Sequence, residues 1–434
     1  MAFRPQRVEV ARVKLWGKNV GAVAWDSKRL VARFEYERSF LQAGLAISPI
    51  IMPLGSGIFS FPELNYDTFL GLPGLLSDAL PDRFGNALID QWLLRQGRSI
   101  SDFSPIERLC YMGSRGVGAL EFEPALERGK IKSLPLEVSE LVSLSHNVLR
   151  SRNNLYIAVN KNEKNALNTI IQVGTSAGGA RAKAVIAWNP KTNEVRSGQV
   201  KAPPGFEYWL LKFDGVADDT LGDPIGFGRV EYAYHLMAAA AGIKMNQCRL
   251  LEENERAHFM IKRFDRDQSG EKVHMQSLCA MGHLDYNMPG AYGYEHAFDL
   301  IQRLNLGHQA MMEQFRRMVF NLVARNQDDH TKNISFLMDG DGAWFLSPAY
   351  DLTWNYNPKG MWTNKHQMQI NGKRDGFTKE DLFVVASRYN IKEAAAIIEK
   401  VGKAVTRWTD FAESARVERS MTQQIKKTHR LYLA

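Results

Sequence analysis

An acidic loop in the last third of the chain constrains the fold most, because it lies between a run of helical periodicity and a run typical of a β-hairpin. Residues 311–327 (MMEQFRRMVFNLVARNQ) carry apolar side chains at helical spacing. The polar residues 328–333 (DDHTKN) follow, and then two apolar runs, ISFLM and AWFL, flank a connection that contains Gly340 and Gly342. This pattern predicts a β-hairpin. A second polar loop, LSPAYDL, comes next and contains Asp351. The expected order is therefore helix, acidic loop, hairpin and second acidic loop.

The spacing of the polar residues in these loops is typical of phosphoryl transfer. Asp328 precedes Asn333 by five residues, and Asp351 lies beyond the predicted hairpin. In protein kinases a catalytic Asp, a Mg²⁺-binding Asn and a second Mg²⁺-binding Asp occur in this order. The first carboxylate accepts a proton from the attacking hydroxyl, while an amide oxygen and the second carboxylate hold Mg²⁺ against the phosphates. We therefore predict Asp328 as the catalytic base and Asn333 and Asp351 as metal ligands.

Two alternatives stay open for this segment. An Asp-rich loop after a helix is often an ordinary turn or cap, and only the joint order of the motifs favours phosphoryl transfer. Chemistry alone also does not choose between Asp328 and Asp329 as the base. The five-residue spacing to Asn333 favours Asp328.

Upstream residues supply the remaining parts of a phosphoryl-transfer site. A kinase needs a Gly-rich hairpin over the phosphates and a strand Lys that grips them, paired with a helical Glu. Residues 174–183 (GTSAGGARAK) fit the hairpin, and Lys212 ends the strand-like run YWLLKF. Glu231 lies early in a predicted helix, residues 229–241, and a further strand is expected over 258–264. Each signal alone is weak, since Gly-rich hairpins and edge lysines are common.

The whole chain is long enough for several packed units. Its 434 residues, 45% of them hydrophobic, can bury one large core or two to three smaller ones. The order of Gly-rich hairpin, strand Lys, helical Glu, further strand, helical segment and the two polar loops predicts an α+β protein with a two-lobed, protein-kinase-like fold. We expect a β-rich amino-terminal subdomain over 1–125, with a strand turn at Gly17–Asn19 and a helix after Pro81. We expect a small lobe with the Gly-rich loop over 126–264, including a strand at 168–173, and a helical large lobe over 265–434.

Composition indicates the cellular location of the protein, the state of its cysteines and the partners that its charge permits. No run approaches the roughly 18 apolar residues of a spanning helix, and the first ten residues lack the apolar block of a signal peptide, so we expect a cytoplasmic protein without a membrane partner. The three cysteines form no CxxC pair, which favours reduced, buried thiols. A net charge of +8 permits contact with nucleic acid, but the charge is dispersed and fits a solvated surface.

The chain resembles the HipA-type serine/threonine kinases, toxins of bacterial type II toxin–antitoxin modules, over nearly its whole length. The most specific matches are DDHTKNISF and LSPAYDL. Looser matches occur at Leu80–Asp82 (LPD), Met112–Leu120 (MGSRGVGAL), Ser176–Lys183 (SAGGARAK) and Lys262–Arg266 (KRFDR).

The resemblance implies roles for particular residues. Asp328 would be the base, Asn333 and Asp351 the Mg²⁺ ligands and Lys212 the ATP-phosphate lysine. The segment from Lys262 to Phe264 would be the hinge beside adenine. The full expected ATP-binding set is Ser176, Ala177, Gly178, Gly179, Ala180, Lys183, Lys212, Lys262, Phe264, His330 and Lys332. His330 is equally compatible with a structural role in anchoring the loop.

The resemblance also implies a built-in off switch. Ser176 occupies the place of a serine that is autophosphorylated in the family, and Thr175 could substitute for it. A phosphate inside the loop that cradles ATP would repel the ATP phosphates. Ser176 could also be only a small turn residue.

The function implied by the resemblance is transfer of the ATP γ-phosphate to Ser or Thr of a protein, an aminoacyl-tRNA synthetase in the family, with arrest of growth. The implied partner is a helix-turn-helix antitoxin of the HipB type, which binds operator DNA, so that any DNA contact by this chain would be indirect. Two departures, Ala182 and Lys262, stand where relatives can have a polar and an acidic residue.

Three other functions remain to be weighed against this one. A metal-dependent phosphohydrolase or nuclease could use Asp328, Asp329, His330 and Asp351 around two ions, but would leave the Gly-rich hairpin and Lys212 idle. A catalytically silent corepressor would not need Asp328, Asn333 and Asp351. A lipid or small-molecule kinase would share the phosphate-handling parts.

Overall fold

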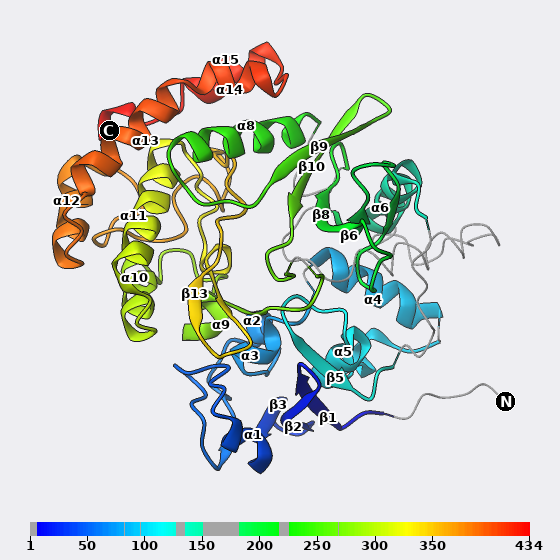
Figure 1. The fold of residues 1–434 in the computed structure, drawn as a ribbon. Helices are drawn as coiled ribbons and strands as arrows, with labels where there is room; N and C mark the ends of the chain where they lie inside the picture. The colour runs from blue at the N-terminus through cyan, green and yellow to red at the C-terminus, as the bar shows by residue number, and fades with distance from the viewer. Residues whose placement is uncertain are drawn as a thin grey trace.

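The computed structural model describes residues 7–81, 83–95, 97–126, 135–150, 182–216, 225–267 and 269–434. These residues form a two-lobed α+β fold of the protein-kinase type, with a β-rich subdomain packed below both lobes in the view of Figure 1. The predicted fold class is confirmed. The predicted Gly-rich loop, including Ser176, Ala177, Gly178, Gly179 and Ala180, and the strand expected at 168–173 lie outside the described residues.

The amino-terminal subdomain is built on a five-stranded antiparallel sheet in the order β4-β3-β2-β1-β5. The strands are β1 (Val10–Leu15), β2 (Lys18–Asp26), β3 (Val31–Tyr36), β4 (Ile58–Phe59) and β5 (Leu120–Glu123). Alternate side chains of β1, such as Val13 and Leu15, are fully buried, as the alternating sequence predicts.

The turn between β1 and β2 differs from the prediction. Leu15 pairs with Lys18, so the turn consists of Trp16 and Gly17 and not of Gly17–Asn19. Both turn residues have positive φ, 49° and 76°, which is the geometry of the two-residue hairpin turn that suits the right-handed twist of the strands. Trp16 tolerates this conformation while its indole N–H donates to the carbonyl of Lys272 at 2.7 Å.

Short helices complete this subdomain. Among them, α5 begins with a capping box in which Ser104 and Glu107 satisfy each other's backbone N–H groups. The helices are α1 (Arg38–Ala43), α2 (Tyr66–Phe69), α3 (Gly74–Ser77), α4 (Arg83–Arg95) and α5 (Pro105–Met112), with a 3₁₀ turn at Ile100–Asp102. The helix expected after Pro81 is α4, and its Phe84 and Leu88 pack in the same hydrophobic cluster as Trp209 of the small lobe.

The small lobe contains a five-stranded antiparallel sheet in the order β7-β6-β8-β10-β9. Its strands are β6 (Lys183–Trp188), β7 (Val195–Ser197), β8 (Glu207–Lys212), β9 (Cys248–Glu253) and β10 (Arg256–Lys262), and its helices are α6 (Val138–Arg150) and α8 (Phe227–Ala240). Trp209 packs in the cluster that includes α4 and α6, while Phe259 and Ile261 cluster with Tyr232 of α8. The short strands β7 and β9 were not predicted.

The large lobe is mainly helical, as predicted. Its helices are α9 (Leu278–Gly282), α10 (Tyr294–Arg303), α11 (Gly307–Val323), α12 (Lys379–Arg388), α13 (Ala394–Thr406), α14 (Trp408–Ser414) and α15 (Arg419–Lys426), with 3₁₀ turns at Thr331–Asn333 and Leu431–Leu433. The predicted hairpin is β12 (Ser335–Met338) and β13 (Trp344–Leu346), and β11 (His274–Ser277) pairs with β12.

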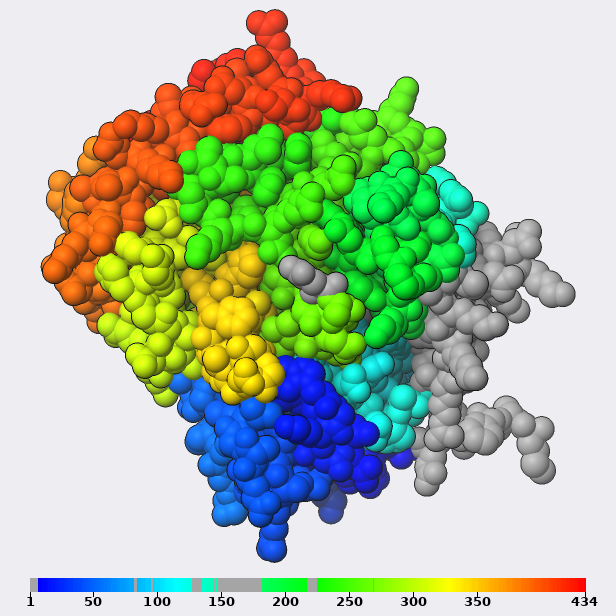
Figure 2. Space-filling model, in the orientation of Figure 1, coloured from blue at the N-terminus to red at the C-terminus, as the bar shows by residue number. Residues whose placement is uncertain are grey.

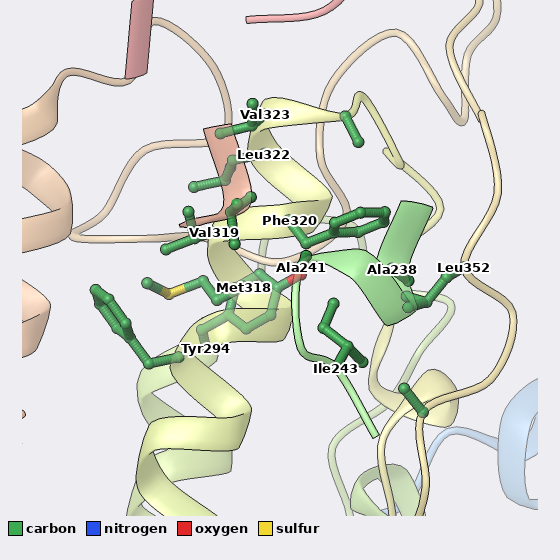
Figure 3. Close-up of a cluster of buried hydrophobic side chains, with 14 of the residues drawn as sticks. Ala238, Ala241, Ile243, Tyr294, Met318, Val319, Phe320, Leu322, Val323 and Leu352 are labelled. Atoms are coloured by element: carbon green, nitrogen blue, oxygen red, sulfur yellow. The ribbon is translucent and has the colours of Figure 1, made fainter. Parts of the chain in front are cut away.

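The core of the large lobe fixes the position of the small-lobe helix α8. Figure 3 shows Ala238 and Ala241 at the end of α8 packed beside Phe320 and Met318 of α11. All four side chains are fully buried. Burial of apolar surface contributes about 25 cal/mol per Å² removed from water. These contacts therefore stabilise the packing of α8 against α11, the helix that leads into the acidic loop.

Polar contacts hold the amino-terminal subdomain against the large lobe. Asp78 accepts hydrogen bonds from the backbone N–H and the hydroxyl of Ser277 at 2.6 and 2.8 Å. The indole N–H of Trp344 in the β12–β13 hairpin donates to the carbonyl of Ala46 at 3.1 Å. Figure 2 shows the subdomain (blue) directly against this hairpin (yellow). Within the described part of the chain, every helix is too short or too polar to cross a membrane.

Candidate active site

Lys212 at the end of β8 lies between two carboxylates. Its Nζ is 2.5 Å from Oε1 of Glu231 in α8, and it also forms an ion pair with Asp351 after the β12–β13 hairpin. Burial alone would lower the pKa of Lys212, but the charges of Asp351 and Glu231 outweigh it and raise that pKa well above its usual value. Lys212 therefore stays cationic throughout the physiological pH range.

A second cation reinforces this arrangement. Lys183 of β6 pairs across the sheet with Lys212, and 2% of its surface is exposed. Burial would raise the pKa of Asp351, but the charges of Lys212 and then Lys183 lower it below its usual value. The Asp351 carboxylate is thus held ionised, as a metal ligand must be.

The acidic loop places Asp328 and Asn333 side by side. Nδ2 of Asn333 donates to the carbonyl of Asp328 at 2.8 Å. This hydrogen bond uses the amide N–H₂ group, so the Asn333 Oδ1 atom is the one left for a cation. One oxygen of Asp328, Oδ1, accepts a hydrogen bond from the indole N–H of Trp362 at 2.6 Å. The Asp328 side chain is 34% exposed, so it is open to a substrate.

Asp329 has a different environment, which separates it from Asp328. Its buried carboxylate accepts hydrogen bonds from the Tyr294 hydroxyl at 2.8 Å, the backbone N–H of Gln367 at 2.8 Å and the His366 ring at 2.7 Å. These donors occupy both oxygens, so Asp329 anchors the loop and is not placed to accept a substrate proton. The sequence alone could not show this, because the donors lie 35 to 38 residues away in the chain.

The two acidic loops are tied together by amide side chains. Asn326 donates from Nδ2 to Oδ1 of Asn321 at 3.0 Å and to the carbonyl of Asp351 at 3.3 Å. Asp351 itself has a φ of 54°, in the left-handed region that non-glycine residues adopt at a cost. The loop around Asp351 is therefore held against the acidic loop by contacts that fix an unfavourable backbone conformation.

The residues that line the space between the loops fit a hard divalent cation. Asn333 and Asp351 line the same cavity of about 20 Å³, together with His330. An amide oxygen and a carboxylate are oxygen donors of the kind Mg²⁺ takes, with water and phosphate oxygens completing its octahedron. Nδ1 of His330 is buried, and within the described residues it has no hydrogen-bond partner. The ring of His330 lies 5.5 Å from that of Tyr286, between centroids.

The other residues expected near the nucleotide are spread along the junction of the lobes. Lys262, at the end of β10, forms an ion pair with Glu207 at 2.7 Å. The ring of Phe264 lies 5.4 Å from the ring of Tyr350, which precedes Asp351. Nζ of Lys332 lies over the ring of Tyr286 at 4.7 Å. The adenine-hinge and phosphate roles of these residues stay predictions.

The KRFDR run has a structural purpose that the sequence did not reveal. Asp265 is buried with Arg263 and Arg266, at 2.6 and 2.9 Å, and accepts the backbone N–H of Gly118 at 2.9 Å. Burial would raise the pKa of Asp265, but the two guanidinium groups lower it far below its usual value. This cluster fastens the segment after β10 to the MGSRGVGAL turn of the amino-terminal subdomain.

The fold and the residues at the lobe junction define a protein of the kinase-like class. The HipA-like C-terminal domain family matches residues 175–409, and the HipA N-terminal domain family matches residues 11–123. The chain therefore belongs to the HipA family.

Two individual proteins are similar to this chain. The HipA chain in the complex of the Shewanella oneidensis MR-1 toxin–antitoxin system HipA, HipB and operator DNA superimposes with a TM-score of 0.65 at 16% identity, over 98% of this chain and 96% of that one. A protein named "Putative kinase Y4mE" from Sinorhizobium fredii is 28% identical over 125 residues, 27% of this chain. The match spans 30% of the length of that relative.

Proposed function

We propose that this protein is an ATP- and Mg²⁺-dependent protein serine/threonine kinase that acts as a HipA-type toxin. The observation that carries the proposal is Lys212, buried between Glu231 and Asp351. Asp351 lines the same cavity as Asn333, whose amide donates to the carbonyl of Asp328. A charged lysine between a helical Glu and a loop Asp is the arrangement that positions ATP phosphates in protein kinases.

The residues divide the chemistry in the following way. Asp328 accepts the proton of a Ser or Thr hydroxyl as that oxygen attacks the γ-phosphorus, and the bond from phosphorus to the β,γ-bridging oxygen breaks, releasing ADP. Lys212 neutralises charge on the phosphates. Mg²⁺, held by Asn333 and Asp351, would neutralise the remaining charge on the phosphate oxygens. Positioning and charge neutralisation account for most of the rate enhancement in this class of reaction.

The contacts of Asp329 weigh against a two-metal phosphohydrolase. That reading needs Asp329 as an ion ligand, but both of its oxygens accept hydrogen bonds inside the large lobe. A silent corepressor is also less well supported, because it would not require a lysine held between two buried or half-buried carboxylates.

Partners and regulation follow from the family. We propose an antitoxin of the HipB type as the partner, supported by the HipA–HipB–operator complex to which this chain is similar. We propose an aminoacyl-tRNA synthetase as the protein substrate, and autophosphorylation of Ser176 as the off switch. A phosphate on Ser176 would repel ATP phosphates from the Gly-rich segment.

The proposal is tested by transfer of labelled γ-phosphate from ATP to a panel of purified aminoacyl-tRNA synthetases. The wild-type protein should label one synthetase on Ser or Thr, and Asp328→Asn should not. The matched control is Asp341→Asn, which makes the same change at an exposed residue of the β12–β13 turn. Binding of ATP with consumption but without transfer to protein would favour a small-molecule acceptor, and failure to bind ATP would overturn the assignment.

A further inference from the structure

The segment Thr428–Arg430, which follows α15, runs back into the large lobe beside α11. The backbone N–H of Arg430 donates to the carbonyl of Val323 at the end of α11, at 2.8 Å. Figure 1 shows this end of the chain (red) beside α13, above α11. Arg430 is 3% exposed. A guanidinium is rarely buried to this extent unless it is paired, so its partners are informative.

The partners of Arg430 lead to the acidic loop in two steps. Its guanidinium contacts Nε2 of His366 at 2.8 Å and also forms an ion pair with Asp375. The opposite ring nitrogen, Nδ1 of His366, lies 2.7 Å from Oδ2 of Asp329. His366 and Asp329 are both buried, so water does not compete for these hydrogen bonds.

These contacts determine which nitrogen of His366 carries the proton. A guanidinium can only donate, so Nε2 of His366 must accept from Arg430. The proton then resides on Nδ1, which donates to Asp329. Arg430 therefore selects the one neutral tautomer that can hold the Asp329 carboxylate. Asp329 is the neighbour of Asp328, so its position fixes the backbone from which the proposed base projects.

The two preceding residues contact the other parts of the site. The Thr428 hydroxyl accepts from the indole N–H of Trp354, three residues after Asp351, at 3.0 Å. His429 contacts the hydroxyl of Tyr234 at 3.2 Å, and Tyr234 lies one turn after Glu231 in α8. One short segment thus contacts α8, which carries Glu231, and the loop that follows Asp351, and it reaches the acidic loop of Asp328 through His366.

We propose that Arg430 is a positioning residue, which aligns the catalytic loop by fixing the tautomer of His366 and through it Asp329. The kinetic part of this proposal rests on the proposed function; the alignment of the loop does not. Arg430 does not touch the reacting atoms, so its effect should appear in the rate of transfer and not in ATP binding.

A double-mutant cycle tests the kinetic part. Arg430→Met and His366→Phe, which removes both ring nitrogens, should each lower kcat at least about tenfold with KM for ATP within about twofold. The double variant should be no slower than the slower single variant, since both changes break the same chain of contacts. Arg430→Lys, which can still donate one N–H to His366, should recover part of the loss. Arg416→Met is the matched control, because Arg416 is 75% exposed in the same terminal region.

Hydrogen exchange of the full-length protein tests the alignment itself. Arg430→Met should speed amide exchange in residues 327–333 and leave exchange in α10 and α12 unchanged. Unchanged exchange in the loop, or an additive double-mutant cycle, would overturn the proposal. If the loop exchanges faster but the wild-type protein transfers no phosphate, the positioning role stands and the kinase assignment fails.

Discussion

The indole N–H of Trp362 donates a hydrogen bond of 2.6 Å to Oδ1 of Asp328. The contact joins the loop that follows Asp351 to the residue proposed as the base. It fixes the rotation of the carboxylate and leaves Oδ2 as the oxygen that can face a substrate hydroxyl.

Removing the indole N–H should slow transfer without weakening nucleotide binding. Trp362→Phe retains a ring but no donor, so Asp328 loses a hydrogen bond to its charged form, which is worth about 1.5 to 3 kcal/mol. We expect kcat to fall about tenfold or more, measured by ADP release, with KM for ATP unchanged. Met361→Ala, at a neighbouring side chain that is 96% exposed, is the control. A Trp362→Phe enzyme with the wild-type rate would show that Asp328 needs no such support.

Lys212 should be indispensable to transfer. Lys212→Met leaves Glu231 and Asp351 facing each other without the shared cation, so we expect a loss of at least about 100-fold in kcat/KM for ATP. Glu231→Gln retains Lys212 and should lower kcat/KM for ATP by less than Lys212→Met does. Lys201→Met, at a lysine whose side chain is 80% exposed, should leave kcat/KM for ATP unchanged. A Lys212→Met variant within tenfold of wild type would contradict the proposed contact with phosphate.

The same substitution should affect protein stability differently at Asp328 and at Asp329. In Asp329→Asn an amide N–H₂ replaces one carboxylate oxygen and faces either the Gln367 N–H or both the Tyr294 hydroxyl and the His366 ring. The substitution should therefore lower the free energy of unfolding by about 3 kcal/mol. Asp328→Asn changes a partly exposed side chain, so it should leave stability within about 1 kcal/mol while abolishing transfer. Chemical denaturation of the two variants measures the difference. Equal stability losses would mean that Asp329 is not the anchor.

Acid should destabilise the protein through buried His274. Burial lowers the pKa of His274 from 6.5 to about 4. The unfolded chain therefore binds more protons between pH 6.5 and 4, so stability is retained above pH 6.5 and lost as the pH falls toward 4, by up to about 3 kcal/mol.

His274→Gln provides the test of this pH dependence. Nε2 of His274 lies 2.9 Å from the carbonyl of Ile47, and a glutamine amide can make the same hydrogen bond without titrating. The variant should show a shallower fall in melting temperature between pH 7 and pH 4. A slope equal to that of the wild-type protein would assign acid sensitivity to other groups.

Local patterns in the sequence were enough to predict the elements that carry the proposed site residues. The helix before Asp328, the hairpin before Asp351 and the strand that ends at Lys212 follow from side-chain periodicity and turn residues. The fold class followed from their order. The strand β9 was missed because only Cys248 of its six residues is buried, so its sequence carries no clear alternation.

The supporting contacts could not be predicted in this way. Trp362, His366 and Arg430 reach the acidic loop from 34 to 101 residues away along the chain, as the spacing of Trp362 from Asp328 and of Arg430 from Asp329 shows. No local pattern marks such contacts, because they depend on how distant segments pack. The packing of Phe84 and Leu88 with the small lobe could not be predicted for the same reason.

The most direct test of the central claim is the intact mass of phosphatase-treated wild-type and Asp328→Asn protein after incubation with Mg²⁺ and ATP, with the modified peptide sequenced. The account predicts that the wild-type protein gains one phosphate on Ser176 and that the Asp328→Asn protein, although it still binds ATP, gains none. Equal phosphorylation of the two proteins would contradict the assignment of Asp328 as the base, and a wild-type protein that binds no ATP would contradict the kinase assignment itself.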